Sequence, residues 1–337
     1  MRLKGLDGIR ALCALLLLWG HIAQKDFVSW EITRLPLPEC VAYVFLAISG
    51  VLAGYRINSV HSMRDYYAKK ARRILPLYYS YILITIVVFI LLGRTSEIIN
   101  TKLFYYLFLV PSIPFALSQG ILPLVHLWFI GTLVLFYLCI PLFAKLDECK
   151  KKRYALTIAA IWFIAKMIMR IMGGGIVYRL ISCTSFDVLF LSVWCGLQLK
   201  DGISIGGAMA VVFSIIAWCL FLLSGLYGHI IPAPVRIEFI SALSLIIIVT
   251  QQRQQYSRLL ENQFARFLGS ISYEIYVGQI LLIILVSQLF MRLNPDIPDL
   301  AIYMTTTLSV VLFAYILKVG VSAVFNTDKS LKCRQNA

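Results

Sequence analysis

Charged residues are scarce in this sequence of 337 residues. Only 14% are Asp, Glu, Lys or Arg, whereas 60% are hydrophobic and the mean hydropathy is +0.85. This composition excludes a water-soluble domain of this length. The alternation of apolar and polar residues that indicates a membrane barrel is lacking as well. Lipid offers backbone groups no partners, so the apolar runs are expected to be helices. The predicted fold class is all-α, a polytopic transmembrane helical bundle.

Acidic residues and paired metal ligands are also few. The eight cysteines form no CxxC pair and no cluster with histidine, so neither a disulfide framework nor a metal site is indicated. The 16 acidic residues against 31 basic ones leave a net charge of +15. In membrane proteins positive residues collect in cytoplasmic loops, which explains the excess without nucleic acid. The lipid bilayer is therefore an expected partner, and nucleic acid is not.

Positive charge also orients the apolar runs. The stretch RINSVHSMRDYYAKKARR, at 56–73, carries six Lys or Arg residues against one acid, so we assign it and the N-terminus to the cytoplasm. Residues 103–125 include Pro111 and Pro114 and are predicted to be re-entrant or interfacial, because a span there would place KLDECKKKR outside. Ten spans are expected: 9–27, 41–55, 74–92, 126–144, 154–172, 180–199, 203–223, 237–250, 269–290 and 299–320.

Counting Lys and Arg supports this map. Twenty lie on the cytoplasmic side, seven outside and four within spans, which accounts for all 31. Both termini are then cytoplasmic, with a transmembrane domain over 1–322 and a tail over 323–337. A cleaved signal peptide is disfavoured, because no small-x-small cleavage pattern follows the first apolar run.

The first apolar run, LDGIRALCALLLLWGH, carries ionisable groups where hydrocarbon makes them costly. Eleven residues separate Arg10 from His21, which is three helical turns plus about 20°, so both side chains share one face. Asp7 precedes Arg10 by one turn and joins this stripe. The two positions lie roughly 16 Å apart along the axis. A functional track is one interpretation; a basic flank with one hydrogen-bonded core histidine is the other.

Four ordered stretches resemble the acyltransferase-3 family. Arg10 to His21 matches the family's pattern of an arginine, ten residues and a histidine, and FLAISG ends in Ser49 and Gly50. The others are YYAKKARRILPLYY and HLWFIGTLVLFYLCIPLF, with a weaker match in SISYEIYVGQ. The resemblance implies an integral membrane enzyme that moves acyl groups from coenzyme A to hydroxyls of cell-surface glycans. It also implies the inner (plasma) membrane.

Three positions depart from the family pattern. Leu133 and Val134 stand where many relatives have two acidic residues, and Gln279 stands where a histidine is frequent. In lacking the two acidic residues, the chain is similar to a shorter branch that includes enterobacterial common antigen and exopolysaccharide acetyltransferases. The family's arginine pair becomes Lys70 and Arg73, and a lysine binds phosphate as a point charge rather than in a bidentate fork.

The chemistry of ester formation from a thioester requires a base near the acceptor hydroxyl. Histidine titrates near pH 6.5, so His21 is the expected catalytic base, and the resemblance implies the same role. Arg10 remains protonated and cannot be the base. It is expected to position the acyl donor, although a structural pair with Asp7 is the alternative.

Donor binding is assigned to the basic cluster before the third span. With Pro76 expected in the first helical turn, the cationic side chains and free helix amides would face the phosphates of acetyl-CoA. Membrane topology alone would also explain the charges. The cluster consists of Lys69, Lys70, Arg72 and Arg73.

A further set of residues is expected to support the base or line an active chamber. Asp187 and Glu274 are the acids best placed to orient a base, unless they pair with Arg170, Arg179 or a headgroup. Ser272, Tyr276 and Gln279 share one helix face, whereas Tyr137 is expected only to pack. The complete supporting set is Asp7, Ser49, Gly50, His126, Trp128, Asp187, Tyr273, Glu274 and Gln279.

The predicted function is transfer of an acetyl group from acetyl-CoA, with no permanently bound cofactor. The acceptor is a glycan or lipid-linked sugar of O-antigen, common antigen or exopolysaccharide. A transporter or flippase of lipid-linked sugars is the alternative, since intramembrane charges also mark translocation paths. A structural scaffold would leave the stripe of Arg10 and His21 unexplained.

Overall fold

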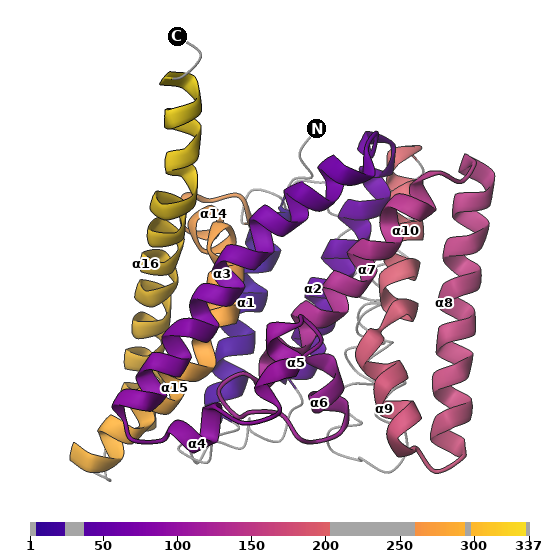
Figure 1. The fold of residues 1–337 in the computed structure, drawn as a ribbon. Coiled ribbons are helices and arrows are strands. Elements are labelled where there is room, and N and C mark those ends of the chain that lie inside the picture. Colours follow the sequence, from indigo (N-terminus) through magenta and orange to yellow (C-terminus); the bar gives the residue numbers. More distant parts are fainter. Residues whose placement is uncertain (1–4, 24–36, 203–259, 294–297, 335–337) are drawn as a thin grey trace.

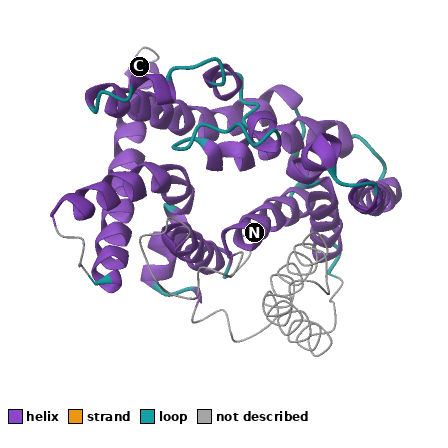
Figure 2. Cartoon of the chain, turned by 90° about the horizontal axis from the view of Figure 1, so that it is seen from below, coloured by secondary structure: helices purple, strands orange, loops and turns teal. Residues whose placement is uncertain are grey.

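The computed structural model describes residues 5–23, 37–202, 260–293 and 298–334 (Figure 1). All regular structure in these residues is helical, as predicted (Figure 2). Two expected spans, 203–223 and 237–250, lie outside the described residues. The long helices are α1 (Leu6–Ala23), α2 (Leu37–Tyr55), α3 (Met63–Leu91), α7 (Trp128–Ala144), α8 (Glu148–Ile171), α9 (Gly175–Thr184), α10 (Phe186–Lys200), α15 (Ser272–Leu293) and α16 (Asp299–Arg334).

Seven described segments are long and apolar enough to cross a membrane, and α2 adds a shorter apolar helix over Val41–Tyr55. Together they coincide with the eight expected spans that the structure describes. α16 continues through most of the predicted tail, to Arg334. α8 and α16 lie at opposite edges of the bundle, with α1, α2 and α3 between them (Figure 1). The short helix α14 (Gln263–Ser270) packs beside α1 and leads into α15.

Helix α3 begins eleven residues before the expected boundary at 74. The Ser62 side chain caps it by accepting a hydrogen bond from the Asp65 amide, 3.3 Å away. Pro76 therefore lies inside the helix, and the expectation that it opens the first turn is wrong. The basic cluster belongs to the helix itself, so its cations do not gather around free terminal amides. Lys69, Lys70 and Arg73 instead share one face of the helix, which Arg72 leaves.

The expected span at 180–199 is broken into α9 and α10. Ser185 between them is fully buried and has a φ of +47°. The break frees carbonyl groups at the end of α9, which neighbouring helices satisfy. Thr132 of α7 donates to the Cys183 carbonyl, and Trp162 of α8 donates to the Ile181 carbonyl at 3.0 Å.

Residues 103–125 contain only short turns of helix at one end of the bundle, including α5 (Leu103–Leu107) and α6 (Ser112–Ala116) (Figure 1). Neither is long enough to span, as expected. The segment packs on α3, where Tyr78 donates its hydroxyl hydrogen to the Tyr106 carbonyl at 2.8 Å. Tyr106 is itself fully buried, and burial raises the pKa of its hydroxyl to about 12. This segment is therefore a packed part of the bundle.

Helices α2 and α10 cross very closely. A Cβ added at Gly54 of α2 would lie 2.1 Å from the Val193 carbonyl oxygen of α10, and one at Gly196 would lie 2.2 Å from the Val51 oxygen. Gly50 faces α10 in the same way. Small residues allow such backbone approach between membrane helices. The crossing fixes the helix that carries Ser49.

Candidate functional site

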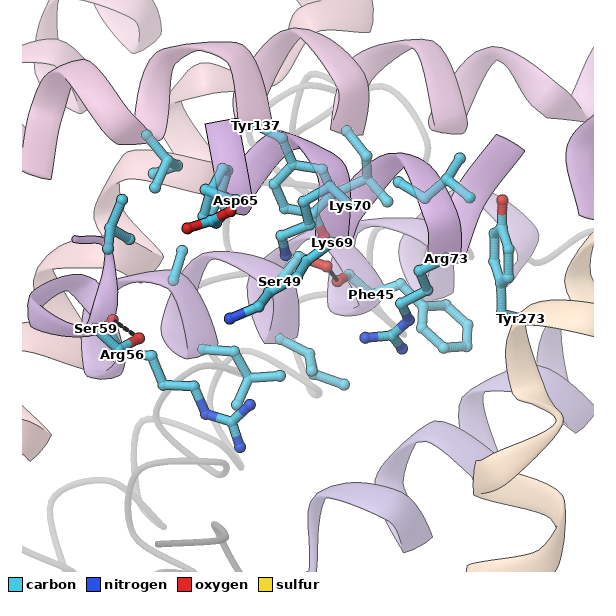
Figure 3. A pocket seen from close by; sticks show the side chains of 18 of the residues that line it. Phe45, Ser49, Arg56, Ser59, Asp65, Lys69, Lys70, Arg73, Tyr137 and Tyr273 are labelled. Atoms are coloured by element: carbon cyan, nitrogen blue, oxygen red, sulfur yellow. Dashed lines mark hydrogen bonds between the residues drawn. The ribbon is translucent and has the colours of Figure 1, made fainter. Parts of the chain in front are cut away.

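A cavity of about 420 Å³ lies among α1, α2, α3, α7 and α15 (Figure 3). Its wall is strongly basic, with Asp65 as its only carboxylate among the described residues. Lysine and arginine donate charge-assisted hydrogen bonds that suit phosphate oxygens. The cations in the wall are Arg10, Arg56, Lys69, Lys70 and Arg73.

One face of α3 supplies most of this charge. Asp65, Lys69 and Arg73 are spaced four residues apart and line successive turns of the cavity wall. Lys70 joins them, whereas Arg72 points elsewhere and donates its Nε hydrogen to the Ala68 carbonyl at 3.2 Å. The structure therefore brings three of the four expected donor-binding cations to the cavity and leaves Arg72 outside.

Lys70 is held by an aromatic ring from another helix. Its Nζ lies 3.7 Å from the ring centroid of Tyr137 on α7 and 5.4 Å from that of Tyr66. The Tyr137 hydroxyl is hydrogen-bonded to Ser49, whose own hydroxyl donates to the Phe45 carbonyl at 3.0 Å. Three helices thus meet at one cation. Tyr137 is a wall residue of the cavity, beyond the packing role that the sequence indicated.

The inner end of the cavity joins α1, α3 and α15. Arg10 Nη1 lies 3.3 Å from the Asp7 carboxylate, as the one-turn spacing predicted. Arg10 and Arg73 are close enough to repel each other. The Tyr273 hydroxyl is buried in the cavity wall and has no hydrogen-bond partner among the described residues. Figure 3 shows Arg73 and Tyr273 at the opposite end of the cavity from Arg56 and Ser59.

The expected base, His21, is half-buried in the last turn of α1 and is not among the residues that line the cavity. The wall at the inner end includes three aromatic residues in edge or tilted contact: Phe45 and Phe129, with ring centroids 6.3 Å apart, and Phe129 and Tyr276, 5.1 Å apart. Tyr276 is in turn in contact with His126, which interacts electrostatically with His21. The two histidines therefore lie beyond an aromatic layer.

His126 is buried and fixed on both sides. Tyr276 donates its hydroxyl hydrogen to the His126 carbonyl, and the ring atom Nε2 lies 2.9 Å from the Val277 carbonyl oxygen. Trp128, two residues later, stacks on Phe115 with ring centroids 5.1 Å apart. Neither His126 nor Trp128 lines the cavity.

Further residues of the expected supporting set also lie outside the cavity wall, among them Asp7 and Gly50. Asp187 forms an ion pair with Lys166 of α8, rather than with Arg170 or Arg179, and both side chains are at most 4% exposed. Gln279 is fully buried, and its amide has no partner among the described residues. Glu274 neighbours the wall residue Tyr273 but does not line the cavity itself.

Sequence reasoning missed the outer end of the cavity and much of its aromatic wall. The charges at 56–65 were assigned to loop topology, which hid their place in a site. A signal was available in α3, because residues 66, 69, 70 and 73 share a helix face that position 72 leaves. The missed wall residues include Arg56, Ser59, His61, Ser62, Asp65, Tyr66, Phe129 and Tyr137.

Comparison with known proteins identifies the family. The profile of the acyltransferase-3 family, described as an acyltransferase domain, matches residues 3–325. No curated protein and no solved structure matches the chain. The matched region contains every residue of the cavity wall and all the motifs on which the resemblance was based. The chain therefore belongs to the acyltransferase-3 family and is an acyltransferase with several membrane-spanning helices.

Proposed function

We propose that this acyltransferase moves an acetyl group from acetyl-CoA to a hydroxyl of a cell-surface glycan. The observation that carries the proposal is the basic cavity, whose wall holds five cations and one carboxylate. Coenzyme A brings a diphosphate and a 3′-phosphate, and such groups are bound by clustered Lys and Arg. The donor phosphates then lie in the cavity, and the acyl end extends from it.

The membrane orientation follows from the distribution of positive charge. The cavity lies beside the loop and first turns of α3, which carry the densest cluster of Lys and Arg. We assign this end to the cytoplasm of the inner membrane, where acetyl-CoA is available. The acceptor enters from the opposite side, as a glycan or lipid-linked sugar of the O-antigen, common antigen or exopolysaccharide type.

His21 is the proposed general base. As the acceptor oxygen attacks the thioester carbonyl, its proton passes to the imidazole, the carbon–sulfur bond breaks, and the proton then returns to the leaving thiolate. An imidazole can accept and release a proton near neutral pH, which suits a histidine to this shuttle. Direct transfer needs no acylated enzyme, so a stable acetyl-enzyme after incubation without acceptor would contradict it.

One feature favours a transporter as the second candidate. The break between α9 and α10 at Ser185 resembles the discontinuous helices of transporters, where irregular backbone lines a substrate path. Here, however, the freed carbonyls are taken by Thr132 and Trp162, and the broken segment contributes no residue to the basic cavity. The acyltransferase assignment is therefore preferred.

A His21→Ala variant tests the proposal in cells whose surface glycan is analysed for O-acetyl groups by mass spectrometry. We expect acetylation to be lost while the amount of membrane protein stays normal. The matched control is Leu12→Ala, a 53% exposed position on the same helix, which should retain acetylation. Unchanged acetylation in the His21 variant, at normal protein level, would overturn His21 as the base.

A further inference from the structure

Tyr273 at the inner end of the cavity has a hydroxyl group with no hydrogen-bond partner among the described residues. Its side chain lines the cavity wall, its hydroxyl is buried, and it interacts electrostatically with Arg73. A buried polar group without a partner is costly, so such a group in a cavity wall indicates a ligand atom that completes it. The missing acceptor belongs in the cavity beside this hydroxyl.

The neighbours of this hydroxyl define the charge of that acceptor. Arg10 and Arg73 line the same end of the cavity and repel each other; Arg10 pairs with Asp7, and Glu274 interacts electrostatically with Arg73 from outside the wall. Within the described residues, the wall as a whole holds five cations and one carboxylate, so it keeps an excess of positive charge for an anion. A phosphate oxygen satisfies both the excess charge and the hydroxyl hydrogen.

Distance decides which phosphate of the donor lies there. His21 lies eleven residues beyond Arg10 on α1, which is roughly 16 Å along the helix axis. The pantetheine arm, from the diphosphate to the sulfur, is a chain of about thirteen bonds and spans roughly 16 Å when extended at ordinary bond lengths. A diphosphate near Arg10 therefore places the thioester at the level of His21.

We propose that Tyr273 donates a hydrogen bond to the diphosphate of the acyl donor, at a subsite completed by Arg10 and Arg73. The inference depends on the proposed use of acetyl-CoA. The 3′-phosphate then lies nearer the outer end of the cavity, beside Arg56. Tyr273 is a binding residue in this arrangement, and it sets how far the acyl group reaches along α1.

Three acyl donors separate the contribution of the diphosphate to binding from that of the 3′-phosphate. Acetyl-CoA carries both phosphate groups, acetyl-dephospho-CoA lacks the 3′-phosphate, and acetyl-pantetheine lacks the diphosphate and the nucleotide. In Tyr273→Phe, the KM for acetyl-CoA and for acetyl-dephospho-CoA should rise by the same factor, roughly ten- to a hundred-fold, because a hydrogen bond to a charged acceptor is lost. The kcat should stay within about twofold, and turnover of acetyl-pantetheine should not change.

Two variants give the contrast. Arg56→Gln should raise the KM for acetyl-CoA but not for acetyl-dephospho-CoA. Tyr315→Phe, on the exposed face of α16, should behave as the wild type with every donor. Calorimetric titration of coenzyme A into the purified protein in lipid nanodiscs gives a binding constant that does not depend on turnover, and it should weaken in Tyr273→Phe by the same factor as KM rises.

Two results would overturn the inference while leaving the proposed function intact. One is a Tyr273→Phe enzyme with wild-type KM for acetyl-CoA. The other is an equal rise in KM with all three acyl donors, which would mean that the Tyr273 hydroxyl has a structural role or contacts the pantetheine arm. A wild-type protein that neither binds coenzyme A nor uses any of the three donors would instead refute the proposed function, and this inference with it.

Discussion

The ammonium group of Lys70 lies 3.7 Å from the ring centroid of Tyr137, in a cavity wall that holds four other cations. A cation over an aromatic face is attracted by the ring quadrupole, and desolvation strengthens the attraction. The contact therefore holds the Lys70 ammonium in place on the cavity wall.

Replacing Tyr137 with leucine should weaken donor binding, because Lys70 loses the ring that holds it. A desolvated cation–π contact contributes about 2 kcal/mol, so the KM for acetyl-CoA should rise roughly tenfold or more. Tyr137→Phe keeps the ring and loses the hydrogen bonds of the hydroxyl to Ser49 and Lys70, so its effect should be smaller. Steady-state kinetics in membranes measure both, and Leu138→Ala, half exposed on the same helix, is the control. Equal effects of the leucine and phenylalanine variants would contradict this account.

The buried pair of Lys166 and Asp187 should respond very differently to single and double substitution. Asp187→Asn leaves a buried ammonium group without its carboxylate, which is expected to cost about 3–5 kcal/mol of unfolding free energy. The double variant Lys166→Met with Asp187→Leu removes both charges and should be much less harmful. Thermal unfolding in detergent, followed by the loss of the monodisperse chromatographic peak, measures the difference. A double variant less stable than Asp187→Asn would refute it.

The close crossing of α2 and α10 should not tolerate a methyl group. In Gly54→Ala the new Cβ would lie 2.1 Å from the Val193 carbonyl oxygen, so the helices must separate and both stability and acetyl transfer should fall. Gly320→Ala on α16 is the matched control, because its Cβ would meet no atom within 4 Å. Removing a helical glycine there should stabilise the protein by up to about 1 kcal/mol. Unfolding temperatures of the two variants should therefore shift in opposite directions.

The aromatic layer between the cavity and the histidines should limit access of water to the acyl group. Phe129→Ala opens this layer beside Tyr276, so hydrolysis of acetyl-CoA without acceptor should rise roughly several-fold while transfer to the glycan falls. Release of free thiol, measured with a chromogenic disulfide, reports the hydrolysis. Phe129→Leu retains most of the volume and should stay near the wild type. Hydrolysis that does not change in Phe129→Ala would show that the layer has no such role.

Much of the fold could be predicted from sequence. The lengths of the apolar runs indicated the helices, and the position of positive charge indicated which loops face the cytoplasm. The stripe on α1 was recognised from spacing alone, and Arg10 indeed reaches the cavity and pairs with Asp7. The predicted start of α3 lay too far along the chain, because the basic stretch before residue 74 was interpreted as a loop. In the structure this stretch is helical, and Ser62 caps its first turn.

Other features depend on contacts between distant segments and leave no local mark. The break at Ser185 has neither proline nor glycine beside it, and hydrogen bonds from Thr132 and Trp162 support it. The pairing of Asp187 with Lys166 could not be chosen from sequence, since Arg170 and Arg179 both lie nearer to Asp187 in the chain. Tyr137 became significant only when folding brought Lys70 over its ring.

The unbroken course of α3 has a mechanical consequence. At 29 residues it is a rod of roughly 43 Å. One end carries cations of the basic cavity, and farther along the helix the hydroxyls of Tyr78 and Tyr79 are hydrogen-bonded to the carbonyls of Tyr106 and Leu107. Because α3 contacts both the cavity and the segment 103–125, we expect a tilt of the helix at the cavity to displace that segment as well.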